Sequence, residues 1–488
     1  MSSKAYIVPV DPKNPGQSSS LWTTLPPSQK HPKVGTSHLF YGARNGNDVT
    51  ALVSLGEGFE AKQGDARREV IRKAVGSGVK SVKALGDGVS EAVVDVLTDP
   101  HASAVAAHLA LYNFTLKTSP PSAFDPRATE KSPEKLTVKP ASDSADWERG
   151  VVYAKAQNLA RTLMELPANV MTPTAFTERV KAELKGISNV DVIVRDEAWA
   201  AEKGMRTFLS VTKGTSEPAK FLEIHYKGAP SPDDQPIAFV GKGITFDSGG
   251  ISLKPSSGMK LMRGDMGGAA AVVSSMLAIA ELKLPINVVA VTPLCENMPG
   301  PSANKPGDII YAMNGKSVEI DNTDAEGRLI LADALYYAST EFKPHTVIDV
   351  ATLTGAMDVA LGEVYTGVFT TSDTLWEQLH AAGESEYDRF WRLPLDEDYG
   401  PQIYSSNADL CNTGGKPAGA CTAALFLKAF VDGIEPQEGK EAAVRWAHVD
   451  IAGTMEFTRP TPYQEKGMTG RPVRAFVEFV RRLSGSQA

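Results

Sequence analysis

Cysteine is scarce in this chain of 488 residues, which contains only Cys295, Cys411 and Cys421. Three cysteines, an odd number in a large chain, cannot form a disulfide framework, so the sequence predicts a protein of a reducing compartment. No apolar run approaches about 18 residues, which excludes an ordinary transmembrane helix. The first ten residues also lack the pattern of a secretory signal and the arginines of a transit peptide. Together these absences predict a cytoplasmic protein.

An excess of positive charge is also missing. The chain has 50 lysines and arginines against 58 aspartates and glutamates, a net charge of −8. This balance argues against a protein that coats nucleic acid or binds broadly to membranes, and we expect neither partner. Apolar residues make up 42% of the chain and charged residues 22%, the composition of a folded, water-soluble protein. At about 150 residues per domain, the length predicts two or three domains.

Several common catalytic motifs are absent as well. The sequence has neither the HExxH motif of a zinc-binding helix nor the GxSxG motif of a serine nucleophile. The segment 241–246 begins like a dinucleotide-binding loop, but Phe246 stands where the third glycine is needed. The eight histidines are scattered without a ligand-like pair. These observations argue against a histidine-based zinc site, a serine hydrolase and a dinucleotide-binding protein.

The strand-like and helical patterns predict an α/β fold in two parts. Residues 1–140 indicate a small N-terminal α/β domain. A helix within 141–166, which Ser144 can cap, joins it to the second part. Residues 167–488 alternate strands with helices, which is typical of a larger α/β domain with a mixed central sheet. The proline-rich segment 118–144 has the composition of a linker.

The individual elements expected from these patterns are as follows. Strands are predicted at 5–10, 49–55, 136–139, 190–194, 221–226, 237–240, 286–292, 346–350 and 444–451. Helices are predicted at 66–75, 103–112, 143–164, 268–282 and 327–341.

A first group of candidate functional residues follows the strand expected at 237–240. Lys242, Asp247, Lys254 and Asp265 occur there among glycines that allow the backbone to approach another group closely. Asp265 directly precedes an expected helix, and for that residue alone simple capping is an equally good interpretation.

A second group lies in the segment that precedes the helix expected at 327–341. If this segment is extended, Asp324, Glu326 and Arg328 project to the same side. Two neighbouring carboxylates raise each other's pKa unless a cation lies between them. Oxygen-rich sites of this kind suit magnesium, manganese or zinc. The alternative interpretation is a solvated acidic turn.

The octapeptide NTDAEGRL at 322–329 matches the signature of the leucyl aminopeptidase family, the two-metal cytosolic aminopeptidases. The resemblance covers most of 145–485 and implies that 167–488 is a catalytic metallopeptidase domain. The region before it resembles the family's accessory domain more weakly. Further matching segments are 241–250, 261–270, 293–308, 351–358, 452–455 and 466–471.

The resemblance implies five ligands for two divalent metal ions: Lys242, Asp247, Asp265, Asp324 and Glu326. Zinc is expected, with manganese or magnesium as alternatives at the more exchangeable site. A lysine binds a metal only as the neutral amine, so its pKa must fall below about 10.4. Two adjacent cations and partial burial act in that direction.

The resemblance also implies two catalytic residues that are not ligands. Lys254 is expected to stabilise the oxyanion that forms on the scissile carbonyl. Arg328 is expected to hold a bicarbonate ion that acts as the general base, since a guanidinium grips a planar anion with parallel hydrogen bonds.

The function that the resemblance implies is removal of N-terminal residues, leucine and other apolar residues preferentially, from peptides. The chain is expected to assemble as a homohexamer, a dimer of trimers. The alternative is a catalytically silent relative with a structural or binding role. Such a relative would lack some of the metal ligands, and this sequence has all five. The residues that match the family's pocket for the first side chain are Met262, Thr352, Gly355, Ala452 and Met455.

Overall fold

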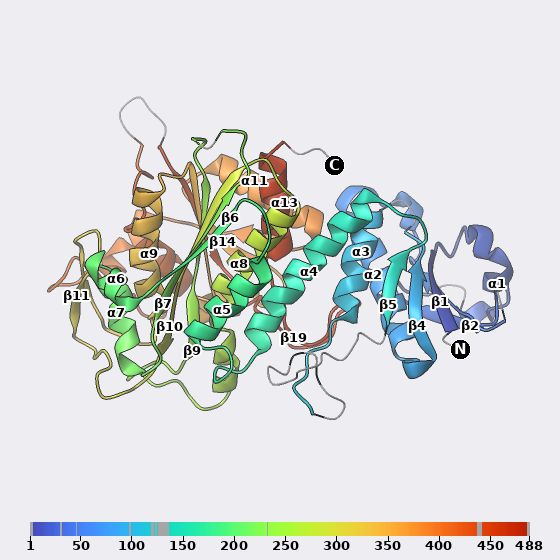
Figure 1. The fold of residues 1–488 in the computed structure, drawn as a ribbon, viewed down its shortest axis with the longest axis horizontal. Helices are drawn as coiled ribbons and strands as arrows, with labels where there is room; N and C mark the ends of the chain where they lie inside the picture. Colours follow the sequence, from blue (N-terminus) through green and yellow to red (C-terminus); the bar gives the residue numbers. More distant parts are fainter. Residues whose placement is uncertain are drawn as a thin grey trace.

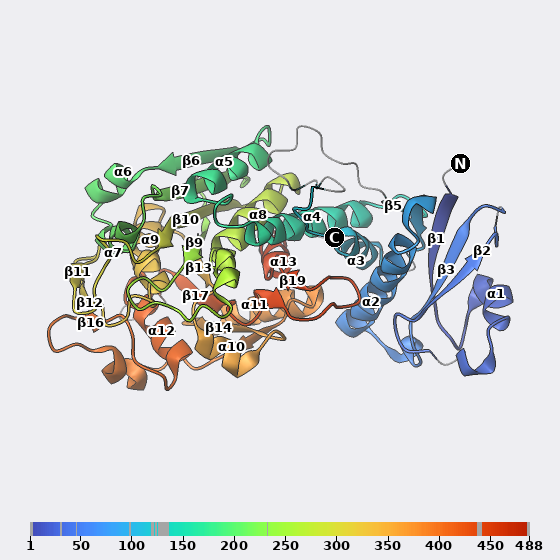
Figure 2. The same ribbon diagram turned by 90° about the horizontal axis from the view of Figure 1, so that it is seen from below.

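Two large β-sheets, two small ones and the helices around them make up the described part of the computed structural model of the chain (Figures 1 and 2). None of the described helices is long and apolar enough to cross a membrane. Most of the proline-rich segment expected as a linker, with four of its five prolines, lies outside the described residues. The structure describes every residue except 1–2, 30–31, 45, 97–98, 119–121, 123, 125–135, 232, 437–441 and 486–488.

The N-terminal part is built on a five-stranded sheet in the order β2-β3-β1-β4-β5. Strands β3, β1, β4 and β5 are parallel to one another, and β2 is antiparallel to β3. The edge strand expected at 136–139 is confirmed as β5. The elements are β1 (Ser3–Val10), α1 (Ser19–Thr23), β2 (Ser37–Tyr41), β3 (Val49–Ser54), α2 (Gly64–Lys83), β4 (Val89–Val94), α3 (Pro100–Leu111) and β5 (Thr137–Pro140).

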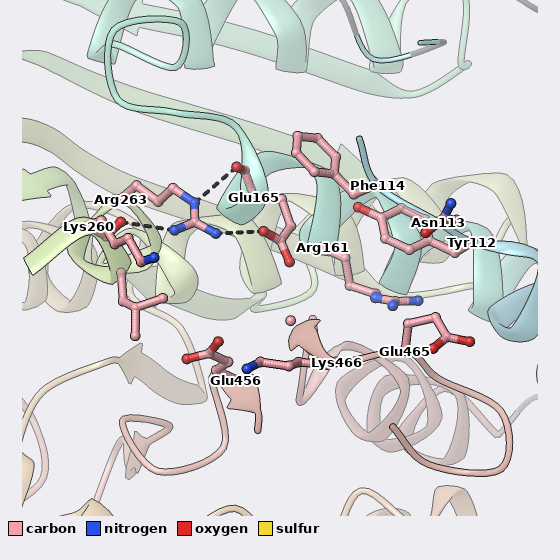
Figure 3. Close-up of a pocket in the computed structure, with 12 residues that line it drawn as sticks. Tyr112, Asn113, Phe114, Arg161, Glu165, Lys260, Arg263, Glu456, Glu465 and Lys466 are labelled. Atoms are coloured by element: carbon pink, nitrogen blue, oxygen red, sulfur yellow. Dashed lines mark hydrogen bonds and ion pairs between the residues drawn. The ribbon is translucent and has the colours of Figure 1, made fainter. Parts of the chain in front are cut away.

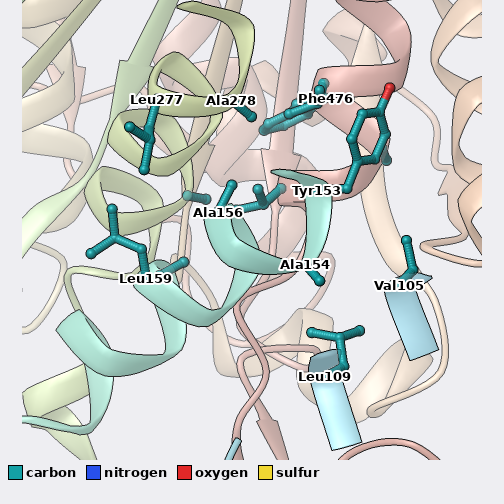
Figure 4. Close-up of a cluster of buried hydrophobic side chains, with 14 of the residues drawn as sticks. Val105, Leu109, Tyr153, Ala154, Ala156, Leu159, Leu277, Ala278 and Phe476 are labelled. Carbon is teal, nitrogen blue, oxygen red and sulfur yellow. The ribbon is translucent and has the colours of Figure 1, made fainter. Parts of the chain in front are cut away.

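Helix α4 (Ala145–Glu165) connects this part to the rest of the chain. Ser144 caps it as expected, because its hydroxyl oxygen accepts a hydrogen bond from the backbone amide of Asp146. Figure 4 shows α4 between Leu109 of α3 on one side and Leu277 of α8 on the other. Both faces of α4 are therefore buried in one apolar cluster, which ties the two parts of the molecule together.

The C-terminal part is built on a nine-stranded mixed sheet, in the order β15-β14-β17-β13-β8-β10-β7-β6, with β9 paired to β10. Its middle strands β17, β13, β8 and β10 are parallel, whereas β14, β7 and β6 introduce antiparallel pairs. The strands are β6 (Val190–Arg195), β7 (Lys220–Lys227), β8 (Ile237–Gly241), β9 (Gly243–Asp247), β10 (Asn287–Asn297), β13 (Thr346–Ala351), β14 (Thr366–Thr370), β15 (Phe390–Arg392) and β17 (Arg445–Asp450).

Helices cover both faces of this sheet. Along β8, Ile237 and Phe239 belong to the apolar cluster that contains α8, whereas Ala238 and Val240 belong to the cluster that contains α9. This alternation explains why the strand is apolar at every position. The helices are α5 (Pro173–Leu184), α6 (Glu197–Glu202), α7 (Arg206–Val211), α8 (Gly267–Glu281), α9 (Gly327–Glu341), α10 (Gly355–Leu361), α11 (Asp373–Glu386), α12 (Gly419–Lys428) and α13 (Val473–Leu483).

Short strands form small sheets beside the large one. β11, β12 and β16 form a three-stranded sheet, and β18 pairs with β19 as an antiparallel ribbon. Sequence patterns did not predict these strands or β9 and β14, because two to five residues are too few to show a period. Their bounds are β11 (Ile309–Tyr311), β12 (Ser317–Glu319), β16 (Leu410–Cys411), β18 (Glu456–Phe457) and β19 (Gly467–Met468).

The carboxyl ends of the parallel strands β8, β13 and β17 meet at one edge of the large sheet, because the three strands are adjacent and in register. In open α/β sheets, ligands bind outside this edge. The loops that follow β8, β13 and β17 begin at Lys242, Thr352 and Ile451. Most of the candidate functional residues identified from the sequence therefore lie at this edge of the large sheet.

Candidate metal centre and substrate cavity

The structure brings together the five side chains expected as metal ligands. Lys242 directly follows β8, and Asp247 is the last residue of β9. Asp265 lies between the 3-10 helix Met259–Gly264 and α8, and Glu326 directly precedes α9. Asp324 lies in the turn before Glu326, so three separate loops contribute to one cluster.

Three buried carboxylates form the centre of this cluster. One oxygen each of Asp247, Asp265 and Glu326 lies within 4.8 Å of the other two. Among the described residues, this is the group of acidic, histidine or cysteine side chains that is arranged to hold a metal ion. No histidine or cysteine belongs to it, in agreement with the oxygen-rich site expected from the sequence.

The two lysines neutralise part of this negative charge. Lys242 Nζ is 2.8 Å from both Asp265 Oδ2 and Glu326 Oε1. Lys254 Nζ is 2.8 Å from Asp247 Oδ2 and 2.5 Å from Asp324 Oδ1. Each ammonium group therefore lies between two carboxylates.

Burial and mutual repulsion shift the titration of these groups. Burial raises the pKa of Glu326 and of Asp265, and the neighbouring Asp247 carboxylate adds to both shifts. Burial alone would lower the pKa of Lys242, but the surrounding carboxylates outweigh it and raise that pKa. The sequence-based expectation of a lowered lysine pKa thus depends entirely on the metal ions, because the protein's own groups act in the opposite direction.

The carboxylate oxygens of the cluster have few donors within the protein. Glu326 Oε2 is buried and has no donor among the described residues, and the buried oxygens Glu326 Oε1, Asp265 Oδ2 and Asp324 Oδ1 have only a lysine ammonium group beside them. Buried carboxylate oxygens that lack donors are costly unless a cation compensates them. Hard oxygen donors of this type suit divalent ions such as zinc, manganese and magnesium. The residues present therefore fit the metal ions that the sequence resemblance implies.

Side chains that the sequence analysis did not assign to the metal centre hold the ligands in place. Asn297 donates a hydrogen bond to Asp247 Oδ1 at 2.8 Å and another to the carbonyl of Thr323 at 3.0 Å. The Thr352 hydroxyl donates to Asp265 Oδ1 at 2.6 Å, and its carbonyl accepts from Lys242. Asn297 lies within 293–308, a segment that resembles the family, and this resemblance could have indicated its role. Thr352 was expected only in the substrate pocket.

Capping does not explain Asp265. Helix α8 begins at Gly267, and the helix has no side-chain capping hydrogen bond. The carboxylate of Asp265 is instead held by Lys242 and Thr352. The capping interpretation of this residue is therefore wrong.

Arg328 lies in the first turn of α9, so the extended conformation expected for 324–328 is wrong. Glu326 already has helical backbone angles, with φ −78° and ψ −34°, and its carbonyl accepts the amide of Ile330. Helical geometry does not place residues i and i+2 on the same side. Arg328 reaches the cavity from the helix start, and its side chain is 7% exposed.

The guanidinium of Arg328 is available for a ligand. Its Nε is buried without a hydrogen-bond acceptor, and the side chain forms no ion pair with any described residue. Burial lowers the pKa of Arg328 to about 10, against the opposing effect of Glu326 and Asp450. A buried guanidinium without a counter-ion favours an anion beside it, so the residue fits the bicarbonate that the resemblance implies.

A cavity of about 1130 Å³ opens over the cluster. Lys242, Asp247, Asp265 and Asp324 line it together with Lys254 and Arg328, whereas Glu326 is 2% exposed and lies behind its wall. The five residues expected to contact the first side chain of a substrate all line the same cavity: Met262, Thr352, Gly355, Ala452 and Met455. The cavity thus joins a charged floor to a largely apolar wall, which suits a molecule with a polar reacting group and an apolar side chain.

Known proteins with the same organisation support this interpretation. Residues 158–477 match the family model described as the catalytic domain of the cytosol aminopeptidase family. The cytosol aminopeptidase of Homo sapiens is 47% identical over 463 residues, which cover 93% of this chain and 85% of the human protein. That of Dictyostelium discoideum is 45% identical over 456 residues, which cover 92% of this chain and 85% of that protein.

Solved structures of the bottromycin maturation enzyme BotP are similar throughout. One has a TM-score of 0.84 and 32% sequence identity, and the likeness covers 100% of both chains. A second, of BotP in complex with Mn, has the same TM-score and identity and covers 99% of this chain and 100% of that one.

Proposed function

The chain belongs to the cytosol aminopeptidase family and is a metal-dependent aminopeptidase. We propose that it releases N-terminal residues from peptides one at a time, with leucine and other apolar residues preferred. The observation that carries the proposal is the meeting of three buried carboxylates and two lysines at the floor of a cavity whose wall is apolar. Nothing favours a catalytically silent role.

Five residues hold two divalent metal ions in this proposal. Asp247 and Glu326 would be shared by the two ions, Lys242 and Asp265 would hold the tighter one, and Asp324 would hold the exchangeable one. When bound, the ions activate a water nucleophile and polarise the scissile carbonyl. Zinc is proposed at the tighter site, with manganese or magnesium as alternatives at the other; the manganese complex of BotP supports divalent ions in general.

The protein's own residues bind and orient the substrate. Lys254 reaches the cavity with its ammonium group and stabilises the negative charge that develops on the carbonyl oxygen. Arg328 holds a bicarbonate ion, which supplies the general base. The apolar wall formed by Met262, Ala452 and Met455 takes the first side chain of the peptide.

Three further proposals concern the whole protein. Residues 1–140 form an accessory domain, 141–166 a joining helix and 167–488 the catalytic domain; the separate sheets on either side of α4 support this division. The protein works in the cytoplasm, as the names of its relatives suggest for them. It assembles as a homohexamer, a dimer of trimers, without nucleic-acid or membrane partners.

Metal content measured together with activity tests the proposed site. We expect two divalent ions per chain, loss of leucine-anilide hydrolysis on chelation, and recovery when zinc or manganese is added. Glu326→Gln removes one buried charge at constant shape, so it should lower the metal content and abolish turnover. Glu341→Gln, at the exposed end of the same helix, is the matched control. Normal rate and full metal content in Glu326→Gln would contradict the assignment.

A further inference from the structure

A second cavity, of about 580 Å³, lies beside the substrate cavity, and we call it the junction cavity (Figure 3). Its volume is within the range of roughly 300–1,000 Å³ that takes small molecules. Leu261 and Glu456 line both cavities, so the two share a wall.

Some of the charged residues that line the junction cavity are already paired. Arg263 Nη2 is 2.7 Å from Glu165 Oε2, and its Nε donates to the backbone carbonyl of Glu165. Glu465 Oε1 is 2.8 Å from Lys80 Nζ. These groups have partners within the protein and do not need a ligand.

Three other charged groups have no such partner. The Glu456 carboxylate and the ammonium groups of Lys260 and Lys466 form no direct hydrogen bond or ion pair with any described residue, although Lys466, Arg263 and Lys260 attract Glu456 at longer range and oppose the rise of its pKa on burial. Figure 3 shows the side chain of Lys466 extending toward Glu456, with the Arg263–Glu165 pair on the opposite side of the cavity. Within the described part of the chain, the cavity therefore offers a ligand one carboxylate and two ammonium groups that have no direct partner.

Arg161 adds a buried positive charge. Its side chain is 2% exposed, lies 3.9 Å from the centre of the Tyr112 ring, and donates through Nε to the carbonyl of Met468. No carboxylate pairs with it among the described residues, and burial lowers the pKa of Arg161 to about 10. Its Nη1 donates to Asn158 Oδ1, and the longer-range attraction of Glu165 and Glu465 offsets only part of the cost of burial, so an anion beside this guanidinium is favoured.

Apolar groups line the remaining wall. Tyr112, Phe114 and Leu261 face the junction cavity. An adjoining hollow of about 540 Å³ shares Phe114 and continues along Leu116, Pro167, Ala168 and Phe246. A ligand here can bury an apolar side chain while its charged groups remain at the polar end.

We propose that the junction cavity binds a free α-amino acid with an apolar side chain. Its ammonium group pairs with Glu456, its carboxylate pairs with Lys466 and Arg161, and its side chain packs against Tyr112, Phe114 and Leu261. An aminopeptidase releases molecules of this chemical class, so the ligand is the enzyme's own product. In this respect the inference rests on the proposed function.

The shared wall couples the two cavities. Leu261 and Met262 are neighbours in the 3-10 helix Met259–Gly264, which leads directly to Asp265. Met455 and Glu456 are likewise adjacent, at the start of β18. A bound amino acid that holds Leu261 and Glu456 therefore changes the wall against which the substrate side chain packs, and it acts as a feedback inhibitor.

Equilibrium dialysis of the metal-loaded protein with radiolabelled L-leucine tests the site directly. We expect Lys466→Met and Glu456→Gln each to weaken one class of leucine site by roughly tenfold to a hundredfold, the effect of losing a charge-assisted hydrogen bond. The matched control is Lys185→Met, an exposed lysine that follows α5. 4-Methylpentanoate, which lacks the ammonium group, and 3-methylbutylamine, which lacks the carboxylate, should compete much more weakly than leucine.

Two outcomes of the dialysis would overturn the proposal. Equal numbers of bound leucine in the wild type and in both cavity variants would show that the junction cavity is not a leucine site. Equal competition by 4-methylpentanoate would show that Glu456 does not receive an ammonium group. Binding is measured without turnover, so a protein that binds leucine here but cleaves no peptide would contradict the proposed function and not this site.

Product inhibition supplies the kinetic test. In the wild type, L-leucine should lower kcat and also raise the apparent KM for a leucine anilide, because it occupies both cavities. In Lys466→Met the effect on kcat should disappear while the effect on KM remains. Purely competitive inhibition of the wild type would overturn the feedback role.

Discussion

Two lysines give the metal centre its electrostatic balance. Lys242 and Lys254 each lie within 3 Å of two carboxylates, and together they offset half of the charge of Asp247, Asp265, Asp324 and Glu326. A metal ion that binds here must compete with both ammonium groups. If Lys242 is a ligand, its proton is released on binding, which makes metal affinity depend on pH.

Lys254→Ala separates catalysis from metal binding. Loss of one oxyanion donor costs about 10²–10³ in rate, so kcat should fall at least that far. The metal content should be kept or increase, because the variant removes a cation that lies between Asp247 and Asp324. Metal analysis and kcat on a leucine anilide give the two readouts, with the exposed Lys316→Ala as control. A variant that loses its metals would show that Lys254 is itself a ligand.

Arg328→Ala tests the proposed bicarbonate site. The salt bridge to Asp324 or Asp321 that would otherwise explain this arginine does not form in the structure. The variant should fold, keep its metals and lose about 10²–10⁴ in rate, the usual contribution of a general base. Wild-type activity should rise when bicarbonate is added to decarbonated buffer, and the variant should not respond. An equal response of both proteins would mean that Arg328 does not hold the base.

At the scale of elements, the start of α9 and the end of β8 depend on each other. Gly327 is the first residue of α9, and a Cβ atom there would lie 2.5 Å from Lys242 Cε and 2.7 Å from its Nζ. The glycine is needed because the lysine passes directly over the first turn of the helix. The signature NTDAEGRL thus contains a residue whose role is to leave space for a side chain about 85 residues earlier in the sequence.

Gly327→Ala should therefore lower activity without unfolding the protein. Alanine favours the helix by up to about 1 kcal/mol over glycine, which offsets part of the steric cost. The displaced Lys242 should reduce both metal content and rate by at least roughly tenfold. Thermal unfolding, metal analysis and kcat measure the three effects. Gly88→Ala, where no atom lies within 4 Å of the added Cβ, is the control. Unchanged metal content and rate would contradict the role given to Lys242.

At the scale of the whole molecule, a buried ionic network joins the N-terminal part to the catalytic part. Glu386, the last residue of α11, pairs with Arg72 of α2 at 3.1 Å, Arg474 of α13 at 3.2 Å and His101 of α3 at 2.9 Å. All four side chains are at most 4% exposed. Burial raises the pKa of Glu386, but Arg72 and the other cations outweigh it and hold the pKa below its usual range.

Glu386→Gln should destabilise the protein by about 3–5 kcal/mol, because it leaves buried arginines without their counter-ion. A carboxylate with a lowered pKa contributes stability above its ordinary pKa of about 4.3 and loses it as the pH falls below that value. The difference in stability between wild type and variant should therefore be constant from pH 8 to about pH 5 and shrink at lower pH. Denaturant unfolding at several pH values measures it. Glu384→Gln, more exposed on the same helix, should change little.

The sequence by itself determined the class of fold, most of the strands of both large sheets and the helices α2, α3, α4, α8 and α9, whereas the helices α5, α11, α12 and α13 were not predicted. Strands buried on both faces are apolar at successive positions, as in β8, and α4 carries a capping serine at its start, so local patterns suffice for both. The resemblance to the family also identified side chains that the fold brings together, because each matching segment, such as NTDAEGRL at 322–329, can be recognised from its residues alone.

Only the tertiary structure decided how those side chains act on one another. The conformation of residues 324–328 depends on where α9 begins. The start of α9 is determined by the packing of this helix against the sheet, and the alternation of residues in the sequence does not predict it. Three features arise between segments far apart in sequence: the positions of Lys242 and Lys254 between carboxylates, the hydrogen bonds that Asn297 and Thr352 donate to Asp247 and Asp265, and the junction cavity. Such contacts depend on distances between elements, and a linear pattern of residues carries no information about those distances.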